Sequence, residues 1–110
     1  MTKKVPARIR KLMKELKEGL AQIYGNKLNA VYLYGSYARG DYRQGSDVDV
    51  MILLKDYKSY WEEIQRSSQL ASDISLKYEV TVSRLFIKEI QWQESVIPVL
   101  RNIRKDGVAA

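Results

Sequence analysis

Two short apolar segments separated by a polar, glycine-containing stretch constrain the fold of this 110-residue chain more than any other feature. Residues 28–34 are rich in strand-forming side chains and end at Gly35. Residues 47–54 begin with the acidic pair Asp47 and Asp49 and continue as an unbroken apolar run. The glycine follows the first strand and the acids open the second. If both serve one site, the two strands must run antiparallel.

The dipeptide Gly35-Ser36 is suited to hold phosphate groups. Glycine lets the backbone turn sharply and approach a ligand closely, and we expect Ser36 to cap a short helical turn that follows. Backbone N–H groups and the serine hydroxyl would then face the phosphates. Residues 41–46 are polar and end near Gly45, so we predict a flexible flap between the turn and the second strand.

Asp47 and Asp49 are predicted to form a metal-binding pair. Strand alternation places both side chains on one face, roughly 6.5–7 Å apart along the strand. Carboxylate oxygens suit hard divalent cations, and the chain has no histidine and no cysteine for a zinc site. We therefore expect Mg²⁺ or Mn²⁺. The alternative for either acid is an ordinary solvated position at the start of a strand.

The sequence resembles a known family through two runs, Tyr34-Gly35-Ser36-Tyr37-Ala38-Arg39-Gly40-Asp41 and Gly45-Ser46-Asp47-Val48-Asp49-Val50. They are similar to the nucleotidyltransferase superfamily to which polymerase β belongs. The closer resemblance is to minimal nucleotidyltransferase (MNT) domains, the antitoxin half of HEPN–MNT toxin–antitoxin pairs. It implies an enzyme with ATP as substrate, in which Gly35, Ser36 and Arg39 bind the nucleotide and Asp47 and Asp49 are catalytic metal ligands.

Members of this family usually have a third carboxylate, for which Glu79 is the candidate. Helical periodicity predicts a helix over residues 58–77, followed by a strand over 78–87 that a crossover makes parallel to the second strand. Glu79 would then stand at the active-site end as metal ligand or general base. Alternatively, Glu79 is an exposed residue and Thr81 occupies the family's acidic position. The base would then be Asp49 or an acid of the partner.

The predicted fold class is α/β, with a small three-stranded mixed sheet and about four helices in one domain, residues 1–110. Such a domain has no room for an acceptor-binding unit, so the acceptor is either held by a second subunit or presented by a partner protein. The resemblance favours transfer of AMP from ATP to a tyrosine of a partner HEPN ribonuclease toxin. The alternatives are a binding-only antitoxin, that is a pseudoenzyme, and a nucleotidyltransferase that acts on a small molecule.

The net charge of +6 is concentrated in the first helix. Residues 1–28 hold eight Lys or Arg against two acids, and the remaining chain is neutral. We interpret the basic side of this helix as solvated; binding of nucleic acid or of an acidic protein is the alternative. No apolar stretch reaches membrane-spanning length, and the start lacks the apolar segment of a signal peptide, so the expected location is the cytoplasm.

Overall fold

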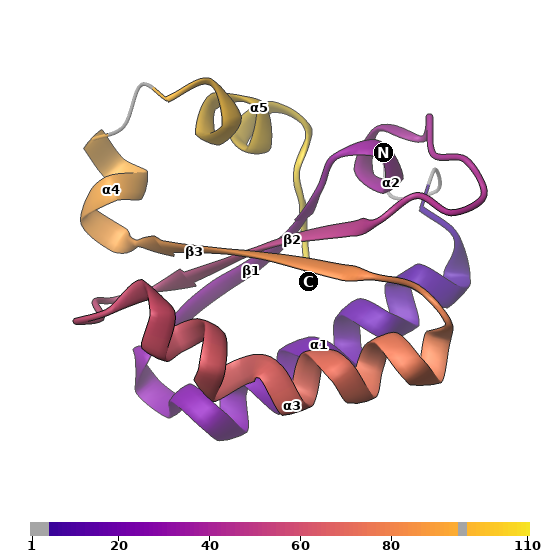
Figure 1. Cartoon of the computed structure of the whole chain (residues 1–110). Helices are drawn as coiled ribbons and strands as arrows, with labels where there is room; N and C mark the ends of the chain where they lie inside the picture. Colours follow the sequence, from indigo (N-terminus) through magenta and orange to yellow (C-terminus); the bar gives the residue numbers. More distant parts are fainter. Residues whose placement is uncertain (1–4, 95–96) are drawn as a thin grey trace.

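The computed structural model describes residues 5–94 and 97–110, so Lys3, Lys4 and the first residues of the expected domain lie outside the described part. Within it, a four-stranded sheet has the order β3-β2-β1-β4 (Figure 1). Its strands are β1 (Leu28–Tyr34), β2 (Val48–Leu54), β3 (Val82–Lys88) and β4 (Val108–Ala109). The α/β class is confirmed, with four strands rather than three.

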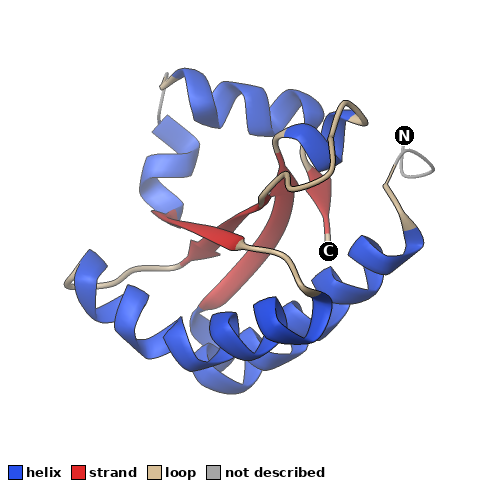
Figure 2. Ribbon diagram, turned by 45° about the vertical axis from the view of Figure 1, so that its right-hand side comes forward, coloured by secondary structure: helices blue, strands red, loops and turns tan. Residues whose placement is uncertain are grey.

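Helices cover both faces of the sheet (Figure 2). The long helices α1 and α3 lie side by side on one face, and the shorter α4 and α5 lie on the other. Each helix of the described residues is too short or too polar to cross a lipid bilayer. The five α-helices are α1 (Ala7–Tyr24), α2 (Ser36–Arg39), α3 (Tyr60–Tyr78), α4 (Glu89–Glu94) and α5 (Pro98–Asp106), and a 3₁₀ turn, η2 (Gly25–Lys27), follows α1.

The expected antiparallel pairing of β1 and β2 is confirmed. The register places Tyr34 opposite Asp49, Tyr32 opposite Met51, and Leu28 opposite Leu54. The exit of β1 therefore lies beside the entrance of β2. The turn at Gly35 and the two acids consequently meet at one end of the sheet.

The expected parallel crossover from β2 to β3 is also confirmed, but its details differ from the prediction. Helix α3 extends to Tyr78, and β3 begins only at Val82. The helix starts where Ser59 accepts a hydrogen bond from the Glu62 N–H at 3.3 Å. The alternation of polar and apolar side chains after Tyr78 suggested an earlier strand start, but residues 79–81 carry the chain out of the helix before it joins the sheet.

Strand β4 was missed because it has only two residues and no sequence pattern of its own. It forms because α5 returns the chain to the free edge of β1, where Tyr32 pairs with Ala109 and Leu33 with Val108. The N–H of Ala110 then donates to Val31 O at 2.9 Å. Pairing of this kind depends on where the helix ends in space and not on local propensity.

Alternation along the strands divides the apolar core into two parts. Val50 and Phe86 face α1 and α3 in the larger part, whereas Met51 and Ile87 face the α4 and α5 side. Ile23, near the end of α1, is 36% exposed and lies outside this core. The apolar side of α1 comprises Ile9, Leu12, Met13, Leu16, Leu20 and Tyr24.

Truncation of Phe86 tests the larger core. This side chain is only 1% exposed, so Phe86→Ala should lower the free energy of unfolding by about 3–5 kcal/mol through lost burial and an unfilled cavity. Leu76→Ala is the matched control because Leu76 is 76% exposed on the same layer. Urea denaturation followed by circular dichroism measures both changes. Equal losses for the two variants would contradict this account of the core.

Candidate active site

The turn after β1 lies directly against the acid of β2. Gly35 has φ 75° and ψ −153°, a backbone conformation that side chains other than glycine rarely adopt. A Cβ added at this position would lie 2.3 Å from Asp49 Oδ2, far inside van der Waals contact. Glycine is therefore required here for two reasons: the backbone conformation and the space taken by the carboxylate.

Ser36 occupies a different helix position from the expected one. Gly35 is the N-cap of α2, and Ser36 is the first residue of the helix without a capping hydrogen bond from its side chain. Its carbonyl accepts the Gly40 N–H at 2.9 Å and the Asp41 N–H at 3.2 Å, which closes the short helix. The prediction that Ser36 caps the turn was wrong, because the glycine already supplies the non-helical residue that starts it.

The two acids differ in environment. Asp47 is exposed and precedes β2, whereas Asp49 is half-buried as the second residue of the strand. Burial raises the pKa of the Asp49 carboxyl, the Asp47 charge raises it further, and Arg39 lowers it. Burial and the nearby Asp49 carboxylate likewise raise the pKa of Tyr34, its partner across β1 and β2. Negative charge at this end of the sheet is thus poorly compensated by the protein itself.

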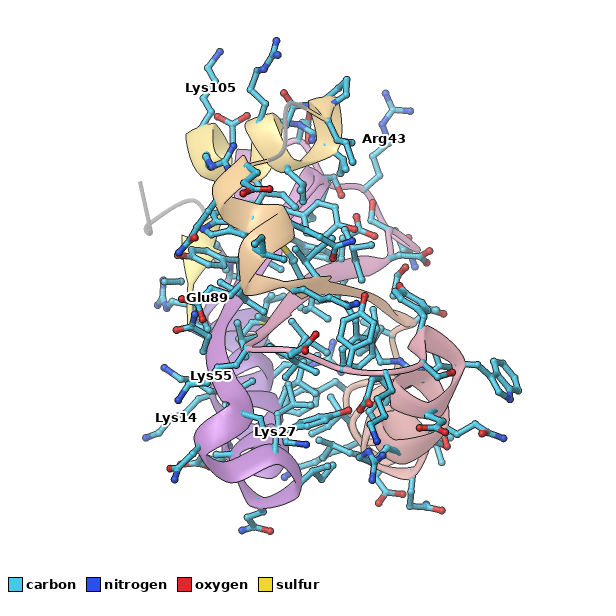
Figure 3. The ribbon with its side chains drawn as sticks, turned by 90° about the vertical axis from the view of Figure 1, so that its left-hand side faces the viewer. Lys14, Lys27, Arg43, Lys55, Glu89 and Lys105 are labelled. Carbon is cyan, nitrogen blue, oxygen red and sulfur yellow. The ribbon has the colours of Figure 1, made fainter. Side chains whose placement is uncertain are left out.

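Arg39 lies at the C-terminus of α2, close enough to Asp49 to affect its pKa. Its Nε donates to Asp41 Oδ2 at 3.2 Å, and both side chains are largely exposed. An exposed pair of this kind adds little stability, so the guanidinium can exchange this partner for another anion at small cost. In contrast, the side chain of Arg43 extends away from the body of the molecule (Figure 3).

The segment between α2 and β2 is anchored by two aromatic rings. Tyr37 of α2 is buried, and its ring stacks on that of Tyr42 with centroids 4.6 Å apart. Further along, the Arg43 N–H donates to Ser46 Oγ at 2.8 Å. Each of these two rings thus packs against the other, which holds the start of the segment to α2.

The expected position of Glu79 was wrong. Glu79 does not start a strand: it is the C-cap of α3 in the left-handed conformation, with φ 56° and ψ 44°, and its N–H donates to Ser75 O. Across residues 5–94 and 97–110, no three acidic side chains come together as a metal-binding group. Glu79 therefore does not complete a carboxylate cluster with Asp47 and Asp49, because β3 begins only at Val82 and leaves Glu79 in the cap of the helix.

Ser83 takes the place beside Asp49 that Glu79 was expected to fill. The parallel register pairs Ser83 with Asp49 and Val82 with Val48, and the Val48 N–H donates to Thr81 O at 2.8 Å. Paired residues on neighbouring strands share a face, so the Ser83 hydroxyl lies on the face of the acids. The sequence did not place Ser83 directly beside Asp49, because the register depends on the unpredicted length of the loop after α3.

A divalent cation fits the chemistry of the residues present. Asp47 and Asp49 are two oxygen donors whose mutual repulsion, together with the partial burial of Asp49, raises the pKa of that carboxyl. A bound cation would remove that cost by favouring the ionised form of both groups. The fit rests on these two carboxylates of the chain.

Comparison with known proteins identifies the family. Residues 11–105 match the family model described as polymerase beta, nucleotidyltransferase. The chain belongs to this family. A provisionally named protein adenylyltransferase of Methanocaldococcus jannaschii, MJ0141, is 44% identical over 78 residues, which cover 71% of this chain and 78% of the relative.

Two solved structures share the nucleotidyltransferase fold. A nucleotidyltransferase-like protein of Sulfolobus solfataricus superposes with a TM-score of 0.65 at 27% identity, covering 93% of this chain and 80% of that one. A chain of the complex between the tri-AMPylated HEPN toxin and the MNT antitoxin of Shewanella oneidensis superposes with a TM-score of 0.52 at 15% identity. That match covers 88% of this chain and 70% of the other.

Replacement of Gly35 tests the contact between turn and acid in this nucleotidyltransferase domain. Gly35→Ala should displace Asp49, because the methyl group would overlap its carboxylate. Gly25→Ala is the matched control: Gly25 has the similar angles φ 54° and ψ −126°, but nothing lies within 4 Å of an added Cβ. Both should lose about 1–3 kcal/mol of stability through backbone strain, measured by urea denaturation.

Only Gly35→Ala should also shift the NMR signals of Asp49 and Tyr34. If the NMR signals of Asp49 and Tyr34 were the same in the Gly35→Ala and Gly25→Ala variants, the prediction that the contact of Gly35 with Asp49 constrains the site would be wrong.

Neutralising Asp49 tests the electrostatics of the site. Because the folded state raises the Asp49 pKa above its unfolded value of about 4, folding weakens as pH rises through that window and stays weaker above it. Asp49→Asn removes this loss. The stability gained over the wild type should therefore be small near pH 4 and largest at neutral pH, in urea denaturation with a chelator present.

Asp73→Asn, at an exposed position on α3, is the control and should show no comparable rise of its effect with pH. An Asp49→Asn variant that is less stable than the wild type at neutral pH would mean that the ionised carboxylate is favourable in the fold.

Proposed function

We propose that this protein is a metal-dependent protein adenylyltransferase that moves AMP from ATP to a tyrosine of a HEPN-type toxin and so neutralises the toxin. The observation that carries the proposal is the contact of Gly35 with Asp49, which brings together the turn to which we assign the phosphates and an acid to which we assign the metal. Membership of the nucleotidyltransferase family supports the reaction class. The named activity of the archaeal relative and the AMPylated toxin in the Shewanella complex support the acceptor class.

The residues of this chain have separate tasks in that reaction. The Gly35-Ser36 turn positions the triphosphate through backbone N–H groups and the serine hydroxyl, and Arg39 compensates phosphate charge from the end of α2. Asp47 and Asp49 would hold Mg²⁺ or Mn²⁺, which supplies charge neutralisation and alignment of the phosphates when bound. The two carboxylates otherwise repel the nucleotide, since like charges face each other across the turn.

The bond changes follow from the substrates. The phenolic oxygen of the acceptor bonds to the α-phosphorus of ATP, and the bond from that phosphorus to the β-phosphate oxygen breaks, so pyrophosphate leaves with the electron pair. The phenolic proton passes to a base. We do not assign Glu79 as this base, because it lies in the cap at the end of α3. The candidates for the base are then Asp49 and an acid of the partner protein.

A binding-only antitoxin is the second candidate, and one observation favours it. Within the described residues the acids of the site form a pair and not a group of three, with Ser83 beside Asp49. A chain that had lost catalysis would still neutralise a toxin by covering it. Transfer to a small hydroxylated molecule is a third possibility, and it has no structural observation in its favour.

The experiment combines the purified chain, radiolabelled ATP, Mg²⁺ and the HEPN-type protein proposed as its partner. We expect label on a toxin tyrosine with the wild type and none with Asp47→Asn/Asp49→Asn, while the double variant still co-purifies with the toxin. Glu79→Gln is the matched acid-to-amide control and should retain transfer within about twofold, because we assign Glu79 no part in the reaction. Loss of a general base would instead lower the rate of transfer by about a hundredfold or more.

The outcomes separate the candidates. Binding without labelling by the wild type would support the binding-only antitoxin and contradict the enzyme. Equal labelling by the double variant would contradict the assigned metal site. Label on a small hydroxylated acceptor, with no association to the HEPN protein, would replace the antitoxin proposal altogether.

A further inference from the structure

Asp49 has a residue with a hydroxyl group on each side of it across the sheet. Tyr34 of β1 pairs with Asp49 of β2, and Asp49 pairs in turn with Ser83 of β3. Cross-strand partners share a face of the sheet, so the phenol, the carboxylate and the serine hydroxyl form one polar row. The next row on this face is part of the apolar core beneath α4 and α5, and it consists of Tyr32, Met51 and Leu85. The polar row is therefore the edge at which that core meets the candidate active site.

The side chain of Tyr34 is half-buried, and it packs against the apolar core beneath α4 and α5. Its hydroxyl forms no hydrogen bond with any other residue of 5–94 or 97–110. The side chain is nonetheless close enough to Asp49 for the carboxylate charge to add to the effect of burial on the Tyr34 pKa, which is raised. A phenol is protonated at neutral pH, so Tyr34 keeps a hydrogen-bond donor beside the acids that the described fold does not use.

The place of Tyr34 in the chain puts this donor on the side of the turn. Gly35 follows Tyr34 directly and starts the turn to which we assign the triphosphate. Ser83 belongs to β3, which flanks β2 on the side opposite to β1, so its hydroxyl lies away from the turn. Of the two hydroxyl groups beside Asp49, that of Tyr34 is therefore the one next to both the assigned phosphate turn and the assigned metal ligand.

We propose that the Tyr34 hydroxyl donates a hydrogen bond to a phosphate oxygen of the bound nucleotide, which makes Tyr34 a nucleotide-binding residue. This assignment rests on the proposed function, which places a triphosphate at the turn. A neutral O–H donor suits the position because it stabilises phosphate charge without repelling the cation that Asp47 and Asp49 would hold. A lysine in its place would repel that cation.

Two other uses of this hydroxyl fit less well. As the base for the acceptor, the phenol would have to lose its proton beside the Asp49 carboxylate, which would bring two like charges together. As a purely structural group, it would need a hydrogen-bond partner in the fold, and the described residues provide none. A donor without a protein partner at the edge of a site is the arrangement expected for contact with a ligand.

The test measures binding of ATP and of inorganic tripolyphosphate to the whole chain by isothermal titration calorimetry, with Mg²⁺ present and no partner protein. Tyr34→Phe should weaken the binding of both ligands by about tenfold or more, because it removes one hydrogen bond to a charged group. Tyr32→Phe is the matched control and should stay within about twofold of the wild type. It removes the same hydroxyl from the same face of β1, but at a position opposite Met51 and stacked on Trp92.

Two further measurements separate contact with phosphate from a change in the fold. Because the Tyr34 hydroxyl has no partner among the described residues, Tyr34→Phe should leave the midpoint of urea denaturation unchanged. In a chain with ¹³C-labelled tyrosine rings, tripolyphosphate should shift the NMR signals of Tyr34 more than those of Tyr32. The Tyr34 signals are identified by their absence from the Tyr34→Phe spectrum.

Four results would overturn the proposal. Equal affinities of the wild type and Tyr34→Phe for both ligands would remove Tyr34 from the site and leave the proposed function intact. Weaker binding of ATP but not of tripolyphosphate would assign the hydroxyl to the nucleoside. Equal weakening by Tyr34→Phe and Tyr32→Phe would mean that the hydroxyl groups act through packing of the core. Absence of binding of either ligand by the wild type would contradict the proposed function as well.

Discussion

The antiparallel pairing of β1 with β2 is the interaction on which the rest of this structure depends. It sets Tyr34 opposite Asp49, and that register places Gly35 against the Asp49 carboxylate. A shift by one residue would turn Asp49 toward the helices α1 and α3 and move Val50 to the opposite face. The same pairing therefore determines both the larger core and the position of the acids.

The candidate site retains unfavourable electrostatics that the fold must offset. Asp49 is partly buried, lies near Asp47, and has Arg39 as the main nearby source of positive charge, although Arg39 also pairs with Asp41. Elsewhere charged groups are satisfied more completely: Arg84, for example, donates to Ile64 O at 2.8 Å and to Ser67 Oγ at 2.6 Å and so ties α3 to β3. Concentrated, poorly compensated acid charge at one end of a small sheet is the arrangement expected of a site that binds cations with its substrate.

Much of the fold and of the site is predictable from sequence because the relevant signals are local. The apolar run before Gly35, the acids before the apolar run of β2, and the periodicity of α3 each lie within one segment. The wrong predictions have a common cause: they concern features that depend on contacts between segments far apart in the chain. The late start of β3 left Glu79 in the cap of α3, and the register of β3 placed Ser83 beside Asp49. Neither the loop length nor the register has a signature in the residues concerned.

The sequence by itself determined the α/β class, the antiparallel pair and the identity of the turn and acids, because strand propensity, glycine and alternating polarity act over a few neighbouring residues. Only the tertiary structure decided which residues stand beside Asp49 and that α5 returns the chain to add β4. These features arise where segments far apart in the chain come into contact, and the balance of packing over the whole molecule determines such contacts.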